Sequence, residues 1–422
     1  MSNNHYDWVI GGQLPELKRH SQAKHEILRS YLVRYIQTLV STPHQDVLSL
    51  TIVDGFAGGG LYQDVAKGVI VPGSPLIALE ACKEAKALIM ERQQRRKDLH
   101  LDVDYFFVEK DPAAHAHLEH VLMERGVSIN APFGGHVYVQ KGSFTDHLEG
   151  ILRYIQSKSR TAGKSIFILD QYSYDDVSLA VLNRILDSIP KAEIILTFNV
   201  GALLTFLNPE NAAQFSAKTG MPNPLNGIGD LSILKADRNW RYIVERNFIG
   251  RLQSLAHAKF FTPFFLRPER GHGDLWLVHL SRHAKANDVM KQTHWEGKNY
   301  IHYGSSGLDM LGYHGGRPLD EQISLLGDEY EFDTIAAART HSALLEGIPT
   351  ALQHGHTTTF GAFVTAHCNG TPGTKEMIAA AAFELAMGGE IVISSEKGRS
   401  RRMSTSIKDT DTIHLPQQIR LL

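Results

Sequence analysis

The N-terminal half of the chain alternates between short apolar runs and longer segments in which apolar residues recur at helical spacing. The first helical segment covers residues 21–40, where Ser21 can act as the N-cap and apolar side chains return every three or four positions. The later apolar runs are short and continuous, which is typical of buried strands. These runs cover residues 48–56, 102–111, 136–142, 164–173 and 192–200.

A helix is predicted after each of the first four strands. These helices cover residues 74–98, 112–126, 144–158 and 175–189. Buried strands that alternate with helices predict a parallel sheet with both faces covered. Because crossover connections are right-handed, the sheet should be doubly wound.

The pattern changes after residue 200. Residues 201–258 are predicted to be mainly helical, and the two apolar runs 259–268 and 273–283 form a hairpin around a Glu-Arg-Gly-His-Gly turn. A doubly wound sheet closed by a hairpin is the arrangement of S-adenosylmethionine-dependent methyltransferases. We therefore expect an α/β, class I methyltransferase-like (Rossmann-like) domain over residues 1–295.

The C-terminal part has a different pattern. Residues 296–370 are rich in Gly and His and are expected to be a helical insertion or a linker of unknown role. Residues 371–422 contain a predicted helix, a Gly-Gly stop, a strand, a basic turn and a second strand. This order is the outline of a small winged-helix-like unit.

The composition of the chain excludes several classes of protein. A length of 422 residues allows two or three domains, and a formal net charge of −2 excludes a globally basic coat protein. The two cysteines, Cys82 and Cys368, exclude a disulfide framework and a multi-cysteine metal site within the chain. The His-rich stretches lack the spacing of a zinc site, so no metal is expected. No apolar run approaches a membrane span and no signal pattern opens the chain, which predicts a cytoplasmic protein.

A glycine-rich turn follows the first strand. Gly58, Gly59 and Gly60 allow the backbone to turn tightly and to approach a ligand. Asp54, at the strand's carboxyl end, can accept hydrogen bonds from the turn or from a ligand ammonium group. Glu109, at the end of the next strand, can accept both ribose hydroxyls of an adenosine-containing cofactor. The alternative is a plain glycine turn beside a surface carboxylate.

Two further strand ends carry polar residues. Ser143, after Gly142, can face an adenine ring, and Asp170 ends the fourth strand. Ligands bind at the carboxyl ends of such sheets, so four polar strand ends in succession favour a cofactor site. An N-cap of the following helix is the alternative role for Asp170.

Six segments together resemble the three-Cys-motif partner protein family, TcmP. They are AKHEILRSYLVRYI (23–36), VDGFAGGGLY (53–62), PGSPLIALEA (72–81), FFVEKDP (106–112), SIFILDQY (165–172) and TKEMIAAAAFEL with its basic wing (374–403). The second and third segments, with Lys24-His25, also resemble methyltransferases that act on an adenine amino group in large-subunit ribosomal RNA.

The resemblance implies a class I fold that uses S-adenosylmethionine, and a partner protein with a three-cysteine motif. It places Lys24, His25, Phe56 and Ser74 near the cofactor, Glu109 at the ribose, Ser143 at the adenine and Asp170 at the catalytic strand end. For some of these residues a structural role is an alternative. Lys24 and His25 could lie on the exposed face of the first helix, and Ser74 could cap the helix that Pro75 begins.

The chain departs from these relatives at one motif. It has Asp170-Gln171-Tyr172-Ser173 where they have Asp-Pro-Pro-Tyr, or Asp-Pro-Tyr or Asp-Pro-Phe followed by Gly. In the catalytic interpretation, Asp170 and a backbone carbonyl accept the two hydrogens of an exocyclic amino group, and Tyr172 stacks on the extruded base. Tyr172 could instead pack at the sheet edge.

The last candidate group is a run of cations in the basic turn, namely Lys397, Arg399, Arg401 and Arg402. No acidic residue lies between positions 397 and 408, so the turn can meet phosphates, although a solvated hairpin turn is the alternative. The sequence thus favours an S-adenosylmethionine-dependent methyltransferase that acts on a nucleic-acid amino group. The alternative function is a non-catalytic, cofactor-binding adaptor that docks the three-cysteine protein.

Overall fold

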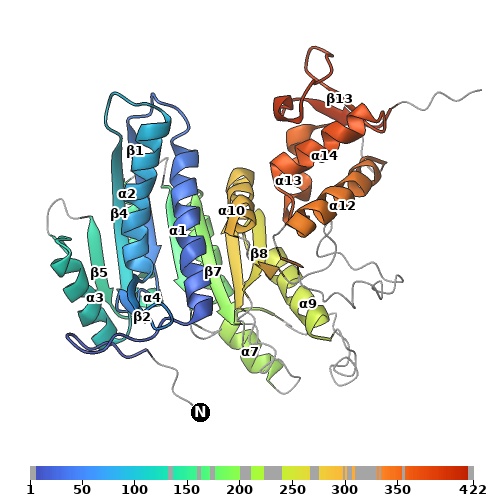
Figure 1. The fold of residues 1–422 in the computed structure, drawn as a ribbon. Helices are drawn as coiled ribbons and strands as arrows, with labels where there is room; N and C mark the ends of the chain where they lie inside the picture. The colour runs from blue at the N-terminus through green and yellow to red at the C-terminus, as the bar shows by residue number, and fades with distance from the viewer. Residues whose placement is uncertain are drawn as a thin grey trace, which may run out of the picture. The chain divides into compact units, whose positions relative to one another are not determined.

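The computed structural model describes residues 6–131, 136–158, 163–171, 176–199, 211–222, 240–266, 275–297, 300–301, 307–308, 330–331, 334–353 and 357–416. The chain divides into two compact units, Met1–Val289 and Met290–Leu422 (Figure 1). Each unit is described by itself.

A seven-stranded sheet with the order β5-β4-β1-β6-β7-β9-β8 forms the centre of the first unit. Its strands are β1 (Val47–Asp54), β4 (His100–Glu109), β5 (Val137–Lys141), β6 (Ser165–Asp170), β7 (Ala192–Asn199), β8 (Phe260–Leu266) and β9 (Leu275–Ser281). The first five of these are parallel, whereas β9 runs antiparallel to β7 and to β8. The strand order reverses between β1 and β6, so the predicted doubly wound, class I methyltransferase-like fold with a terminal hairpin is confirmed.

Helices connect the parallel strands. The first unit contains α1 (Arg19–Leu39), α2 (Ser74–Arg92), α3 (Pro112–Glu124), α4 (Phe144–Lys158), α5 (Leu179–Ser188), α7 (Ala212–Thr219) and α9 (Trp240–Leu255), and α10 (Ala284–Gly297) spans the division between the units. The N-cap of α1 is Lys18, whose backbone is extended, so the predicted cap Ser21 is wrong: it lies inside the helix. The second predicted helix ends at Arg92 rather than at residue 98.

The register of the sheet decides which side chains share a face. Asp54 aligns with Phe107 of β4 and with Ile168 of β6, so Glu109 and Asp170, two residues further on, point to the same face as Asp54. Helices α1 and α2 lie side by side on one face of the sheet (Figure 1). Lys24 of α1 reaches Asp170, which identifies this as the face that carries the three carboxylates.

A short hairpin of β2 (Leu61–Asp64) and β3 (Val69–Pro72) lies between the glycine turn and α2. Together with the longer α2, it accounts for much of the long sequence distance between Asp54 and Glu109. The N-terminal segment runs beside this hairpin, because Leu17 donates a backbone hydrogen bond to Gln63, and Gln63 donates one to Pro15.

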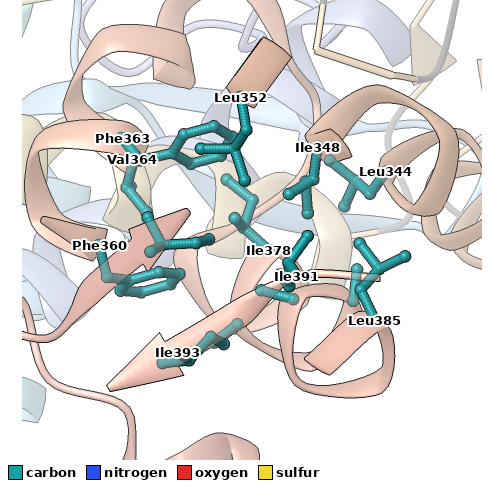
Figure 2. Close-up of a cluster of buried hydrophobic side chains, with 14 residues drawn as sticks. Leu344, Ile348, Leu352, Phe360, Phe363, Val364, Ile378, Leu385, Ile391 and Ile393 are labelled. Carbon is teal, nitrogen blue, oxygen red and sulfur yellow. The ribbon is translucent and has the colours of Figure 1, made fainter. Parts of the chain in front are cut away.

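The second unit contains α12 (Thr334–Gln353), β12 (Thr358–Thr359), α13 (Phe360–His367), α14 (Lys375–Met387), β13 (Val392–Ser394) and β14 (Thr412–His414), with two short 3₁₀ helices and the small pair β10 (Tyr300–Ile301) and β11 (Tyr330–Glu331). The three-stranded sheet has the antiparallel order β12-β14-β13. Figure 2 shows its core, in which Ile348 and Phe360 pack with Ile378 and Ile393. The boundary expected at residue 371 therefore falls inside this core, because the helices before that residue supply six of its 14 buried residues.

None of the described helices combines the length and the apolar composition needed to cross a membrane. Both cysteines are buried free thiols.

Candidate functional site

Three carboxylates lie at the carboxyl ends of adjacent strands: Asp54 ends β1, Glu109 ends β4 and Asp170 ends β6. Since the strand order is β4-β1-β6, Asp54 is the central member. The carboxyl ends of parallel strands meet at one edge of a sheet, so the convergence of these three carboxylates could be predicted from the sequence alone.

The glycine turn folds against Glu109. Gly58 and Gly60 have φ values of +62° and +87°, a region that side chains with a Cβ rarely occupy. The backbone amide of Gly58 donates to Glu109 Oε2 over 2.7 Å, and the amide of Asp111 donates to Oε1 over 2.7 Å. Both carboxylate oxygens are thereby oriented, and each keeps a lone pair for another donor.

An aromatic cluster, which the sequence did not reveal, supports the same turn. A Cβ at Gly59 would lie 2.4 Å from the Trp8 ring, so only glycine allows this approach. The indole Nε1 of Trp8 donates to the Leu61 carbonyl over 2.9 Å, and Tyr62 packs edge-on against the same ring. The N-terminal segment lacks helical or strand periodicity, so its two aromatic residues, Tyr6 and Trp8, were the only signal of this packing.

Asp54 is completely buried and is only partly hydrogen-bonded. Its Oδ1 accepts the Phe56 amide over 3.1 Å, whereas Oδ2 has no partner with hydrogen-bond geometry among the described residues. Burial raises the pKa of Asp54 to about 7; a weak hydrogen bond from the Ser74 hydroxyl and the bond from the Phe56 amide lower it, and the charges of Asp170 and Glu109 raise it further. Near neutral pH this carboxyl therefore exchanges readily between its two charge states.

Lys24 pairs with Asp170. The ammonium Nζ lies 2.7 Å from Oδ1 and 2.5 Å from Oδ2, which excludes the alternative that Lys24 points into solvent from the first helix. Burial alone would raise the pKa of Asp170, but the charge and the hydrogen bonds of Lys24 outweigh it and hold that pKa below its usual value. Asp170 is not an N-cap, because Ser178 caps the next helix.

His25 lies beside this ion pair. Its Nδ1 is buried without a hydrogen-bond partner among the described residues, and its ring centroid lies 5.9 Å from that of Tyr62. Burial, together with the neighbouring charge of Lys24, lowers the pKa of His25 to about 4, against an opposing effect of Asp170. The imidazole is therefore neutral at physiological pH.

Of the other predicted cofactor residues, Ser74 and Phe56 have no capping role, whereas Ser143 has one. Ser74 is the first residue of α2 behind the N-cap Gly73, so the alternative of a capping role is excluded for it. Phe56 is half-buried, with its ring 6.5 Å from that of Phe144. Ser143, in contrast, has a capping role at the start of α4, because its hydroxyl accepts the Asp146 amide over 3.3 Å.

Gln171 stands where the motifs that the chain resembles have proline, and its side chain reaches forward along the chain. Its Oε1 accepts the Val177 amide over 2.9 Å, and its buried Nε2 has no partner among the described residues. The bond joins the two ends of the segment between β6 and α5. Tyr172, the predicted stacking residue, lies outside the described residues.

The four cations of the basic turn have different surroundings. Arg401 forms a forked ion pair with the buried carboxylate of Asp411, in which Nε lies 2.6 Å from Oδ2. Lys397, Arg399 and Arg402 are exposed. The structure thus separates one structural cation from three that face solvent.

One cluster in the described part of the chain has the composition of a metal site: Asp102, Asp104 and His136. The ammonium group of Lys158, at the end of α4, contacts both aspartates. The positive charge that a metal ion would supply is already provided by this lysine, so the cluster is read as an ion-pair network.

The sheet and its carboxylate edge define a class I methyltransferase-like fold. No protein-family model and no curated protein matches the chain.

Three solved structures are similar in arrangement. A candidate caffeoyl-CoA O-methyltransferase from Staphylococcus aureus is 11% identical, with 58% of this chain and 81% of that chain covered and a TM-score of 0.24. A candidate O-methyltransferase from Klebsiella pneumoniae is 13% identical, with 59% and 79% covered and a TM-score of 0.26. The protein EvdMO1 is 11% identical, with 77% and 52% covered and a TM-score of 0.26. At these TM-scores the similarity supports no inference, and the fold class rests on the strand order and the register.

Proposed function

We propose that the chain is an S-adenosylmethionine-dependent methyltransferase that acts on an amino group of a nucleic acid. The observation that carries the proposal is the edge formed by Glu109, Asp54 and Asp170, where the central carboxylate is fully buried and its Oδ2 has no well-aligned hydrogen-bond donor among the described residues. An unsatisfied buried acceptor costs about 1–3 kcal/mol, so its presence at a strand end favours a ligand that donates to it.

The residues fit the cofactor. Glu109, held by two backbone amides, has lone pairs for the ribose hydroxyls, and Asp54 Oδ2 can accept the ammonium group of the methionine part. Gly58 and Gly60 provide a turn without side chains beside them. When bound, S-adenosylmethionine supplies a methyl group on a positively charged sulfur.

Asp170 and Lys24 would orient the nucleophile. The lone pair of an exocyclic amino nitrogen is delocalised into the base, so it attacks poorly unless its hydrogens are held. Asp170, kept ionised by Lys24, can accept one of these hydrogens and favour a pyramidal nitrogen. It can also take the proton that the nitrogen loses once its new bond to carbon has formed.

The second unit supports a nucleic-acid target. Its order of helix, strand, two helices, strand, long turn and strand matches the order expected of a winged helix, which supports that prediction. The exposed faces of α14 carry Glu376 and Glu384, which would repel phosphates, whereas Lys397, Arg399 and Arg402 face solvent from the turn between β13 and β14. We therefore assign phosphate contact to the turn rather than to α14.

The resemblance to the TcmP family supports a three-cysteine-motif protein as the partner. A non-catalytic adaptor remains the second candidate, because Gln171 stands where the related motifs have proline. In that case the same edge would bind cofactor while the partner protein carried out the chemistry.

Two measurements test the proposal. Calorimetry with S-adenosylmethionine tests binding, and transfer of a tritiated methyl group to total RNA, DNA or the partner tests activity. We expect binding and transfer to nucleic acid, with transfer abolished in Asp170→Asn and unchanged in the surface variant Asp98→Asn. Binding without transfer to any of the three would favour the adaptor, and the absence of binding would refute both functions.

A further inference from the structure

Helix α1 has a second polar attachment to the sheet, far from Asp170. The hydroxyl of Tyr31 donates to Glu193 Oε2 of β7 and lies 3.0 Å from His279 Nε2 of β9. His279 Nε2 also lies 3.0 Å from Glu193 Oε2. All three side chains are almost completely buried. We name this group the rear cluster.

The rear cluster lies toward the amino end of β7. Asp170 aligns with Thr197, four positions after Glu193, which corresponds to about 13 Å along a strand. Tyr31 follows Lys24 by seven positions, about 10.5 Å along a helix. The two distances agree, so α1 runs along this part of the sheet with a polar contact at each end.

Stability alone does not explain such a cluster. Buried polar and ionic groups can often be replaced by apolar side chains of similar volume without loss of stability. The rear cluster is also incompletely satisfied, because His279 Nδ1 has no hydrogen-bond partner among the described residues. A buried atom of this kind costs about 1–3 kcal/mol.

The rear cluster can instead fix the position of helix α1 on the sheet. The buried apolar residues of α1, such as Ile27 and Ile36, contribute contacts that are largely non-directional. The N-cap of α1 makes no side-chain hydrogen bond. A slip of one residue would move the helix by about 1.5 Å and rotate it by about 100°, which would carry Lys24 away from Asp170.

We propose that Tyr31, Glu193 and His279 are positioning residues that fix the axial and rotational position of α1 and thereby hold Lys24 against Asp170. The inference deepens the proposed function, on which its consequence for methyl transfer rests. Its structural part, the pairing of Lys24, does not depend on any activity.

The test measures that pairing directly. Brief acetylation with acetic anhydride, quantified by mass spectrometry, reports how well Lys24 is protected. Lys158 is the internal reference, because its side chain is similarly buried, 18% exposed against 12%, and is paired with aspartates on the other face. Tyr31→Phe removes only the hydroxyl, and Tyr35→Phe is the matched control one turn further along α1.

We expect Lys24 to be acetylated about ten times faster in Tyr31→Phe, which corresponds to a loss of about 1.4 kcal/mol in the preference for the observed position. Lys158 should be unchanged, and so should Lys24 in Tyr35→Phe. Glu193→Gln, which keeps an acceptor for Tyr31, should retain most of the protection. Wild-type protection of Lys24 in Tyr31→Phe would overturn the proposal.

A second variant covers the case in which Tyr31→Phe does not fold. The combination Tyr31→Phe, Glu193→Leu and His279→Leu replaces the whole cluster with apolar groups and should fold. It should melt at or above the wild-type temperature and still lose the protection of Lys24, whereas retained protection would refute the positioning role. Cofactor calorimetry on the wild type separates the two hypotheses, since a failure to bind would refute the proposed function without altering the labelling result.

Discussion

The affinity for S-adenosylmethionine should fall as the pH drops through about 7. Asp54 is the group responsible, because burial raises the pKa of its carboxyl to about 7 in the free protein. Its unpartnered Oδ2 is the acceptor that we assign to the ligand's ammonium group. A protonated carboxyl cannot make that charge-assisted bond, so binding requires the ionised form.

The magnitude follows from the pKa. At about pH 6, one unit below the pKa, about a tenth of the protein carries ionised Asp54, so the apparent Kd should be about tenfold larger, equivalent to about 1.4 kcal/mol. Binding should release close to one proton at about pH 6 and about half a proton at about pH 7. His25, with a pKa of about 4, and Asp170, whose pKa lies below its usual value, do not change charge in this range.

Calorimetry across about pH 6 to 8, in two buffers with different ionisation enthalpies, measures both the affinity and the number of protons released. Asp54→Asn is the control: it should bind more weakly than the wild type at about pH 8 and keep only the dependence on pH that the ligand's own amino group produces. The amino group of the ligand titrates at a pKa of about 7.7–8.0, but it affects both proteins equally. A wild-type affinity that is flat or rises toward low pH would refute the reasoning, as would the same slope in Asp54→Asn.

The same group affects folding in the absence of ligand. The folded protein binds a proton at Asp54 more tightly than the unfolded chain does, because the pKa is raised from 3.8 to about 7. The stabilisation from this site is therefore present below about pH 4 and is lost as the pH rises through about 7.

The remaining predictions concern three other features. Lys24→Met should lower the free energy of unfolding in urea by about 2 kcal/mol, because Asp170 loses its cation, and Asp170→Asn in the same chain should recover part of the loss. Gln171→Ala should leave cofactor affinity within about twofold but slow single-turnover methyl transfer about tenfold or more, because the segment after β6 loses the bond that joins its ends. Arg401→Ala should lower the melting temperature, whereas Arg399→Ala should leave it unchanged, weaken RNA binding and reduce the salt slope by about one.

The sheet could be predicted because each buried strand is a continuous apolar run, and the carboxylate edge because parallel strands end together. The convergence of Asp54, Glu109 and Asp170 could be predicted from their positions at the strand ends without further information. The rear cluster could not be predicted in the same way, since Tyr31 is separated from Glu193 by 162 positions and from His279 by 248. The only signal in the sequence was that Glu193 and His279 lie inside apolar strands. A buried polar residue needs a partner, but the sequence does not show which residue that partner is.

The second unit was harder to predict for a different reason. The helices α12 and α13 fall within residues 296–370, a stretch that is rich in Gly and His. The buried residues of α12 recur every four positions, a helical pattern that the prediction left unused, whereas the eight-residue α13 is too short to show one and packs with α14 in the same core. The individual cations of the turn were visible in the sequence, but the pairing of Arg401 with Asp411 required the fold.

The choice between enzyme and adaptor depends on which buried atoms lack partners. Asp54 Oδ2, His25 Nδ1 and Gln171 Nε2 are all unpartnered among the described residues, and each belongs to the edge or to an element that contacts it. Each such atom costs about 1–3 kcal/mol unless a bound group or an ordered water molecule pairs with it. A bound cofactor would account for Asp54, whereas His25 lies beside the ion pair of Lys24 with Asp170, where an acceptor substrate would lie in the proposed function. An adaptor has no use for a free ring nitrogen at that second position, so its presence favours the enzyme.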